Sequence, residues 1–241
     1  VGEPEEMAPQ NVIEVLYQEA QKKENRIYPC NGTIEFKQAV SRYLKRLIGV
    51  DFDPATEIVH CMGAKNGLAQ LPLAFVNQGD TVVSTAPGYP VLPTMVEYLG
   101  GKMSYLKLTA ANKYLPDLKE LRSILSTTKI KLLLLNYPNN PTGALANLEF
   151  FKEVVDLAHQ HNFVIVQDAA YSDHCFTENF CSPFQVPGGK DVTIELYSLS
   201  KSYNMQGFRL GFVVSNKTLL NAFSVVKDLS LIHISEPTRL R

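Results

Sequence analysis

A lysine held between serines is the first residue in this sequence whose surroundings suggest chemistry. Lys201 follows Ser198 and Ser200 in the stretch SLSKSYNMQGFRLGF, and Arg209 comes eight residues later. Most lysines in loops are solvated charges with no specific task. Hydroxyls and a guanidinium are good hydrogen-bond donors to phosphate, however. The stretch therefore predicts an amine next to a phosphate site, if other elements bring matching groups to it.

The elements that would position this lysine are strands and helices in alternation. From about residue 58, short β-branched runs alternate with longer amphipathic runs, which is typical of βα units that build a mostly parallel sheet. The run IKLLLL is too apolar for a strand with one wet face and suits a sheet covered on both sides. Strands are predicted at residues 57–62, 81–85, 102–108, 130–135, 163–167, 193–198 and 211–215. We therefore expect an α/β domain with a seven-stranded, mostly parallel sheet.

Helices are predicted between these strands and at both ends of the chain. Asn147 can cap one of them, because apolar residues recur at helical spacing from Phe151 to Ala158. The other predicted helices span residues 11–23, 67–76, 91–99, 117–125 and 217–227.

Polar residues follow five of the predicted strands. In an open parallel sheet the carboxyl ends of the strands meet at one edge, where ligands bind. The residues placed there are Gly63, Ala64 and Lys65, then Tyr89 in PGYP, Asn140 in NYPNNPTG, Asp168 and Tyr171 in DAAY, and Ser198, Ser200 and Lys201. The sequence thus predicts one site with an amine, a carboxylate, phenols, an amide and hydroxyls.

Pyridoxal phosphate has a part for each of these groups. Lys201 can form a Schiff base with its aldehyde, and Asp168 can keep its pyridine nitrogen protonated. Tyr171 and Asn140 can donate to its ring oxygen, and Tyr89 can stack on its ring. The phosphate can bind the remaining donors, which are Ser198, Ser200, Arg209 and the backbone amides of residues 63–65. Each residue alone has an ordinary structural alternative, such as a cap or a turn, but the complete set at five strand ends favours the cofactor.

The ordered motifs YPCNG, GAKNG, PGYP, NYPNNPTG, DAAY and SLSKSYNMQGFRLG resemble those of the fold type I, class I/II pyridoxal-phosphate-dependent aminotransferases. The resemblance extends over nearly the whole chain, up to about Asp228. The stretch QVPGGKDVTIELYSLSKSYNMQGFRLGF, together with GAKNGL, is most similar to the LL-diaminopimelate aminotransferase group. The fold implied is the three-layer α/β/α large domain of the pyridoxal-phosphate-dependent transferases.

The resemblance implies a role for each matching residue. Lys201 becomes the Schiff-base lysine and proton carrier, Asp168 the partner of the pyridine nitrogen, and Tyr89 the stacking aromatic. Tyr171 and Asn140 become the partners of the ring oxygen, with Asn140 also near the substrate. The phosphate site becomes Ser198, Ser200, Arg209 and the amides of Ala64 and Lys65. Gly2 is expected near the substrate carboxylate. Tyr28 is expected to reach the phosphate of a neighbouring subunit, which implies a homodimer.

The resemblance also divides the chain. Residues 1–27 match an N-terminal arm or part of a small domain, and residues 28–228 match the cofactor-binding large domain. Residues 229–241 depart from the family pattern and resemble a translated sequencing-adapter read-through. The family's arginine for the substrate α-carboxylate has no match in this chain, so we expect the 241 residues alone to transaminate poorly.

The composition argues against some classes of binding partner. Lys and Arg number 23 against 24 Asp and Glu and are scattered, which argues against nucleic acid, and no apolar run reaches the roughly 20 residues of a membrane span. Cys30, Cys61, Cys175 and Cys181 have neither metal-site nor disulfide-framework spacing, so we expect thiols in the reducing cytoplasm and no metal site. An amino acid and a 2-oxo acid are the expected substrates.

Three other functions stay open from the residues. A β-eliminating lyase would use the same Lys201 and Asp168 and release ammonia without an acceptor. A cofactor-binding sensor domain of a transcription regulator would keep this fold without turnover. A plain α/β scaffold without a cofactor is the least favoured, because it leaves the convergence of groups at the strand ends unexplained.

Overall fold

The computed structural model describes residues 2–26, 29, 31–176 and 179–235, with only the backbone for 229–235. A seven-stranded sheet lies at its centre, in the order β1-β7-β6-β5-β4-β2-β3. In this sheet β7 runs antiparallel to both neighbours, and the other pairings are parallel. The strands are β1 (Ile58–Cys61), β2 (Thr81–Ala86), β3 (Lys102–Lys107), β4 (Ile130–Asn136), β5 (Val164–Asp168), β6 (Thr193–Ser198) and β7 (Gly211–Ser215). All seven predicted strands are confirmed.

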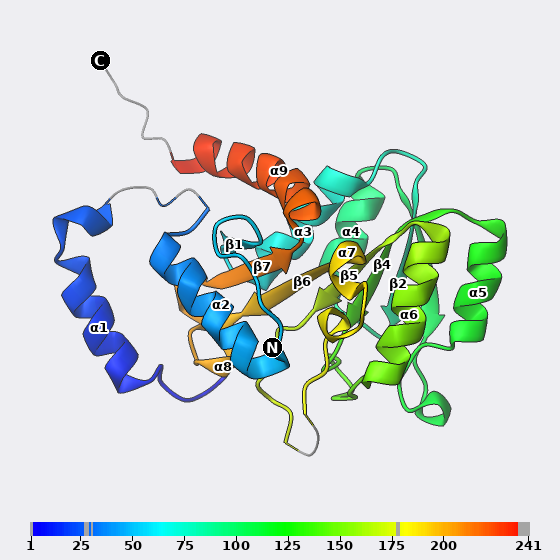
Figure 1. The fold of residues 1–241 in the computed structure, drawn as a ribbon, viewed down its shortest axis with the longest axis horizontal. Coiled ribbons are helices and arrows are strands. Elements are labelled where there is room, and N and C mark those ends of the chain that lie inside the picture. The colour runs from blue at the N-terminus through cyan, green and yellow to red at the C-terminus, as the bar shows by residue number, and fades with distance from the viewer. Residues whose placement is uncertain (1, 27–28, 30, 177–178, 236–241) are drawn as a thin grey trace.

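Helices cover both faces of this sheet (Figure 1). The helices α2 (Ile34–Ile48), α5 (Leu118–Thr127) and α6 (Leu148–His161) pack on one face, and α3 (Ala64–Phe75), α4 (Val91–Tyr98) and α9 (Lys217–Ser235) on the other. The remaining helices are α1 (Gln10–Ala20), α7 (Gly189–Val192) and α8 (Leu199–Ser202), with 3₁₀ turns at Lys23–Arg26, Ala110–Asn112, Pro183–Gln185 and Gln206–Phe208. The three-layer α/β/α architecture is therefore confirmed.

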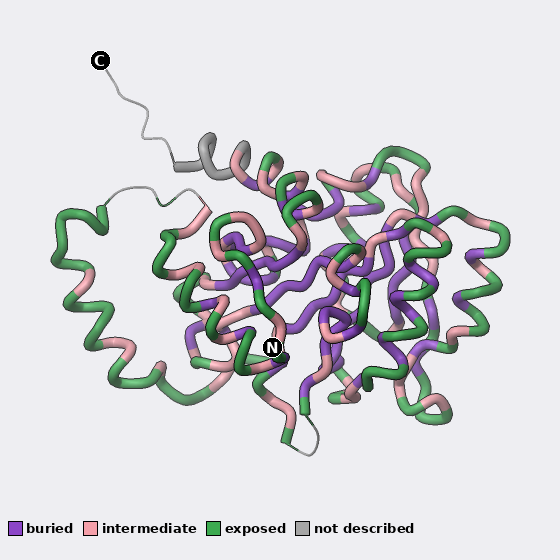
Figure 2. Tube along the Cα trace, in the orientation of Figure 1, coloured by how far each residue is buried: buried purple, intermediate pink, exposed green. Residues whose placement is uncertain are grey.

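Strand β4 shows why the central strands read as continuous apolar runs. Leu133 and Leu135 pack with α5 and α6 on one face, while Leu132 and Leu134 pack with α3 and α4 on the other. Figure 2 shows the same burial along the neighbouring strands. A strand covered on both faces favours apolar side chains at successive positions, so its sequence reads as a continuous apolar run.

Helix α2 was not among the predicted helices. Thr33 caps it by accepting a hydrogen bond from the Phe36 amide at 3.3 Å, and Gly49 ends it in the left-handed conformation (φ 74°). Val40, Leu44 and Ile48 form its buried stripe. The signal is present in the sequence as a cap, a four-residue apolar spacing and a glycine.

Two further elements differ from the prediction. Helix α9 ends at Ser235 rather than at residue 227, and α3 begins at Ala64 rather than at residue 67. Helix α1 has no buried residue and stands apart from the layers (Figure 1). Within the described part of the chain, no helix is both long and apolar enough to cross a membrane.

The packing of α2 predicts a stability effect. Leu44 is wholly buried between α2 and the sheet, so Leu44→Ala should lower the free energy of unfolding by about 2–5 kcal/mol. The matched variant Leu73→Ala removes a side chain that is 46% exposed on α3 and should change it by less than about 1 kcal/mol. Urea denaturation of both variants measures the difference. Equal losses would show that α2 does not contribute to the core as described.

Candidate active site

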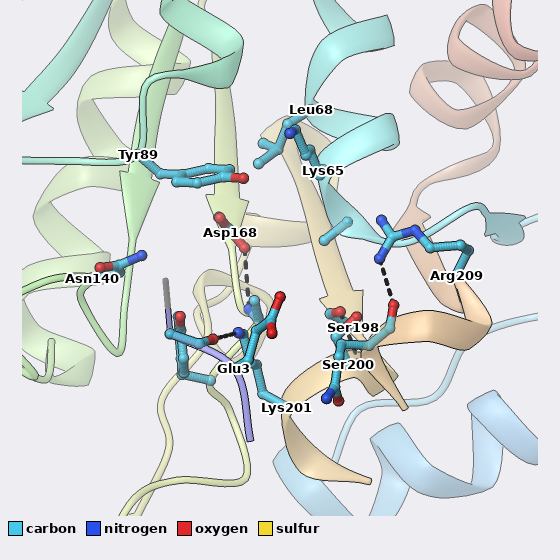
Figure 3. A pocket seen from close by; sticks show the side chains of 15 residues that line it. Glu3, Lys65, Leu68, Tyr89, Asn140, Asp168, Ser198, Ser200, Lys201 and Arg209 are labelled. Atoms are coloured by element: carbon cyan, nitrogen blue, oxygen red, sulfur yellow. Dashed lines mark hydrogen bonds between the residues drawn. The ribbon is translucent and has the colours of Figure 1, made fainter. Parts of the chain in front are cut away.

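The polar residues at the strand ends surround one cavity of about 390 Å³ (Figure 3). It opens beyond the carboxyl ends of β5 and β6 and the N-terminus of α3. The predicted residues that line it are Gly2, Ala64, Lys65, Tyr89, Asn140, Asp168, Tyr171, Ser198, Ser200, Lys201 and Arg209. The structure thus brings these side chains together, while their individual roles stay predictions.

Two predicted site residues are not part of this lining. Gly63 lies just behind it: φ is 77°, and a Cβ there would come within 2.6 Å of Arg209 Nη2. A side chain at position 63 would therefore displace the guanidinium. Tyr28, predicted to serve a neighbouring subunit, lies outside the described residues.

Asp168 ends β5 with its side chain turned into the cavity (Figure 3). The residue is only 6% exposed, and its Oδ1 accepts a hydrogen bond from the Ala170 amide at 3.1 Å. Burial raises the pKa of this carboxyl to about 6, and the Ala170 hydrogen bond opposes the rise. A carboxylate in this setting would be stabilised by a cationic N–H.

Asn136, at the end of β4, holds the neighbouring loop in place. Its Nδ2 donates to the Asp168 carbonyl at 2.8 Å, and its Oδ1 accepts from the Asn140 amide at 2.8 Å. The two strand ends and the loop that carries Asn140 are therefore tied through one buried side chain. The sequence analysis did not single out Asn136 for this role, although it lies in the NYPNNPTG motif.

Lys201 is positioned by the short helix α8 that follows β6. Ser198 caps α8 by accepting from the Ser200 amide at 3.2 Å, which turns the chain sharply at the strand end. Lys201 Nζ lies 6.0 Å from the centroid of the Tyr171 ring and donates to the Gly2 carbonyl. Lys201 therefore lines the same cavity as Asp168 (Figure 3).

Arg209 and the start of α3 form the positively charged side of the cavity. Nη1 of Arg209 donates to the Gln206 carbonyl at 2.8 Å, and Nη2 to the Met62 carbonyl at 3.3 Å, which fixes the guanidinium. The N-cap of α3 is Gly63, which has no side chain to bond the first amides of the helix. These amides, the helix dipole and the guanidinium together suit a phosphate.

Two phenols complete the site. Burial raises the pKa of Tyr89 and of Tyr171, and the nearby Asp168 carboxylate raises both further. Both hydroxyls therefore stay neutral at physiological pH and can donate hydrogen bonds.

Four lining residues were not predicted: Glu3, Leu68, Ala170 and Gln206. Ala170 and Leu68 lie within predicted motifs or helices and could have been included by position. Glu3 and Gln206 reach the site because the N-terminal segment crosses the loop after Lys201, a contact between residues about 200 positions apart. The resemblance implied that this segment reaches the site, through the expected place of Gly2 near the substrate, although no periodicity in the sequence indicates the contact.

The sequence profile of the family described as Aminotransferase class I and II matches residues 1–239. The chain belongs to this family. It is 45% identical over 229 residues to the LL-diaminopimelate aminotransferase of Methanocaldococcus jannaschii, covering 95% of this chain and 54% of that protein. The LL-diaminopimelate aminotransferase of Moorella thermoacetica is 41% identical, and the match covers 95% of this chain and 59% of that protein. The chain thus spans little more than half the length of these relatives.

Solved structures agree in fold. An aminotransferase from Staphylococcus aureus superposes with a TM-score of 0.89 at 37% identity, covering 95% of this chain and 61% of that one. A probable N-succinyldiaminopimelate aminotransferase from Thermus thermophilus gives a TM-score of 0.88 at 31% identity, with 95% and 62% covered. The predicted aminotransferase resemblance is confirmed.

Pyridoxal phosphate is the cofactor of this family, and the residues of the cavity fit it. The buried Asp168 carboxylate matches a protonated ring nitrogen, because burial makes it costly without a cation. Arg209 and the amides at the start of α3 match a phosphate dianion. Lys201 provides the amine that an aldehyde requires.

The raised pKa of Asp168 predicts a measurable instability of the cofactor-free protein. Asp168 ionises more readily in the unfolded chain than in the folded protein. The folded protein therefore loses stability as the pH rises above the pKa that Asp168 has in the unfolded chain. Asp168→Asn should therefore raise the free energy of unfolding at pH 7 by roughly 1–3 kcal/mol. The gain should shrink toward pH 5, where the folded carboxyl is mostly protonated. The exposed-site variant Asp156→Asn is the control, and an Asp168→Asn gain independent of pH would contradict the assignment.

Proposed function

We propose that the protein carrying this chain is a pyridoxal-phosphate-dependent aminotransferase that moves an amino group between an amino acid and a 2-oxo acid. The observation that carries the proposal is the shared cavity lined by both Lys201 and the buried Asp168 carboxylate, with the uncapped N-terminus of α3 beside them. LL-2,6-Diaminopimelate is the proposed donor, supported by the names of the relatives at 41–45% identity, and 2-oxoglutarate is the proposed acceptor.

Pyridoxal phosphate supplies an aldehyde that reacts with amines and a protonated ring that stabilises the electron pair left by removal of an α-proton. Asp168 would keep the ring nitrogen protonated, and Arg209, Ser198, Ser200 and the amides of residues 63–65 would hold the phosphate. Tyr89 would pack on the ring, while Tyr171 and Asn140 would donate hydrogen bonds to its oxygen.

Lys201 carries the proton. Once its amine is free of the aldehyde it would act as a base, taking the proton from the substrate α-carbon and returning it to the former aldehyde carbon of the cofactor. Its tether on the short helix α8 keeps Nζ within the cavity during both transfers. Gly2, whose carbonyl contacts this Nζ, lies where the substrate carboxylate would enter.

We further propose the division into an N-terminal arm at residues 1–27, a cofactor-binding domain at 28–228 and a distinct tail at 229–241. The separate position of α1, which has no buried residue, supports the first boundary. A cytoplasmic homodimer, with Tyr28 contributing to the neighbouring site, is proposed from the family resemblance. Size-exclusion chromatography with light scattering on the full protein tests the dimer.

The first test of the function targets the amine. Protein loaded with pyridoxal phosphate should absorb visible light, and borohydride should remove that absorption and fix the cofactor to Lys201, as peptide mapping would show. Lys201→Ala should lose the absorption and at least about a thousandfold in turnover, because general base and attachment point are both removed. The exposed Lys119→Ala serves as the control. Unchanged absorption in Lys201→Ala would contradict the site assignment.

The second test separates the reaction classes. Loaded full-length protein, given LL-2,6-diaminopimelate and 2-oxoglutarate, should form glutamate in proportion to donor consumed. Ammonia and a thiol released from an S-substituted cysteine, given without 2-oxoglutarate, would instead support the β-eliminating lyase. Cofactor binding without turnover of either donor would support a sensor domain.

A further inference from the structure

Glu3 is the acidic side chain of the cavity that the proposed chemistry does not use. The charged residues among the lining are Glu3, Lys65, Asp168, Lys201 and Arg209. Asp168, Lys201 and Arg209 serve the cofactor, and the Lys65 amide lies in the phosphate site. Among the described residues, the Glu3 carboxylate has no hydrogen bond or ion pair of its own. Figure 3 shows it turned toward the same space as the Lys201 side chain.

The backbone on both sides of Glu3 is tied to the Lys201 loop. The Gly2 carbonyl accepts from Lys201 Nζ, and the Pro4 carbonyl accepts from Gln206 Nε2 at 3.2 Å. The Met7 carbonyl accepts from Asn204 Nδ2 at 3.2 Å. The segment of residues 2–7 therefore lies across α8 and the turn after it, so the position of Glu3 is set by contacts with the site itself.

A carboxylate at this position constrains what can bind. The Asp168 carboxylate already matches the cationic ring nitrogen, and the phosphate is anionic, so the cofactor has no group left for Glu3. The α-amino group of a substrate is consumed by the aldehyde, and an α-carboxylate is repelled by Glu3. The substrate group that Glu3 can bind is therefore a second ammonium, farther along the donor.

We propose that Glu3 is a specificity-determining residue that selects amino donors carrying a second ammonium group. The proposal rests on the proposed aminotransferase function and assigns part of its substrate preference to one residue. It also predicts an effect of opposite sign for the acceptor: 2-oxoglutarate has no cation and two carboxylates, so Glu3 can only hinder its binding.

The test compares two donors that differ only in the second amino group, LL-2,6-diaminopimelate and L-2-aminopimelate. With the loaded full-length protein, we expect kcat/KM to favour the diamino acid, and Glu3→Gln to reduce this preference by about tenfold. The rate with L-2-aminopimelate should not fall, and the KM for 2-oxoglutarate should stay constant or decrease. Glu5→Gln is the matched control, because Glu5 lies on the same segment, is exposed and does not line the cavity.

A second readout does not require turnover. Borohydride reduction fixes the cofactor, and calorimetry then measures the binding of LL-2,6-diaminopimelate and of L-2-aminopimelate, whose α-amino groups both stay free, to wild type, Glu3→Gln and Glu5→Gln. A loss in Glu3→Gln that is larger for the diamino acid supports the proposal, and equal losses for the two ligands, or no loss, overturn it.

The outcomes distinguish this inference from the proposed function. Transamination with an unchanged donor preference in Glu3→Gln, or equal losses with both donors, overturns the role of Glu3 and leaves the function standing. A wild-type preference for N-succinyl-diaminopimelate, whose second amine carries no charge, also overturns it. If no donor is turned over, the proposed function fails, and the calorimetric comparison alone decides the role of Glu3.

Discussion

The buried carboxylate of Asp168 is the constraint on which the rest of the site depends. Holding it at the end of β5 costs free energy, because the low-polarity interior disfavours its charge and a single amide hydrogen bond offsets only part of that. The carboxylate lies at the edge of the sheet formed by the carboxyl ends of the parallel strands, where the loops after the strands spread apart. Asn136 then ties β4, β5 and the Asn140 loop together, so the carboxylate cannot relax toward solvent by a shift of its strand.

The opposite side of the cavity has the complementary charge, and backbone supplies much of it. Gly63 leaves the first amides of α3 without a side-chain cap and leaves room for the Arg209 guanidinium, which two carbonyls hold in place. The cavity of about 390 Å³ thus has the Asp168 carboxylate on one wall and the positive groups on another, and Lys201 also lines it. Such an arrangement orients a ligand that is cationic at one end and dianionic at the other.

The N-terminal segment adds the part of the site that we propose to contact the substrate. Its carbonyls accept hydrogen bonds from Lys201, Asn204 and Gln206, and Glu3 lines the same cavity as residues almost 200 positions later. The family's architecture explains the cofactor residues, since they follow strands of the sheet. Glu3 follows no strand, and its position depends only on these contacts.

The sequence by itself determined the seven strands, the covered sheet and most of the residues that line the cavity, because strand periodicity and the polar residues after each strand are local patterns. It also contained α2, whose Thr33 cap, buried stripe and Gly49 end are local signals that the prediction passed over. Only the tertiary structure decided that Glu3 and Gln206 line the cavity, that Asn136 ties two strand ends, and that burial raises the pKa of Asp168. These features arise from contacts between residues that are distant in the chain and from the exclusion of water, and a local stretch of sequence contains neither.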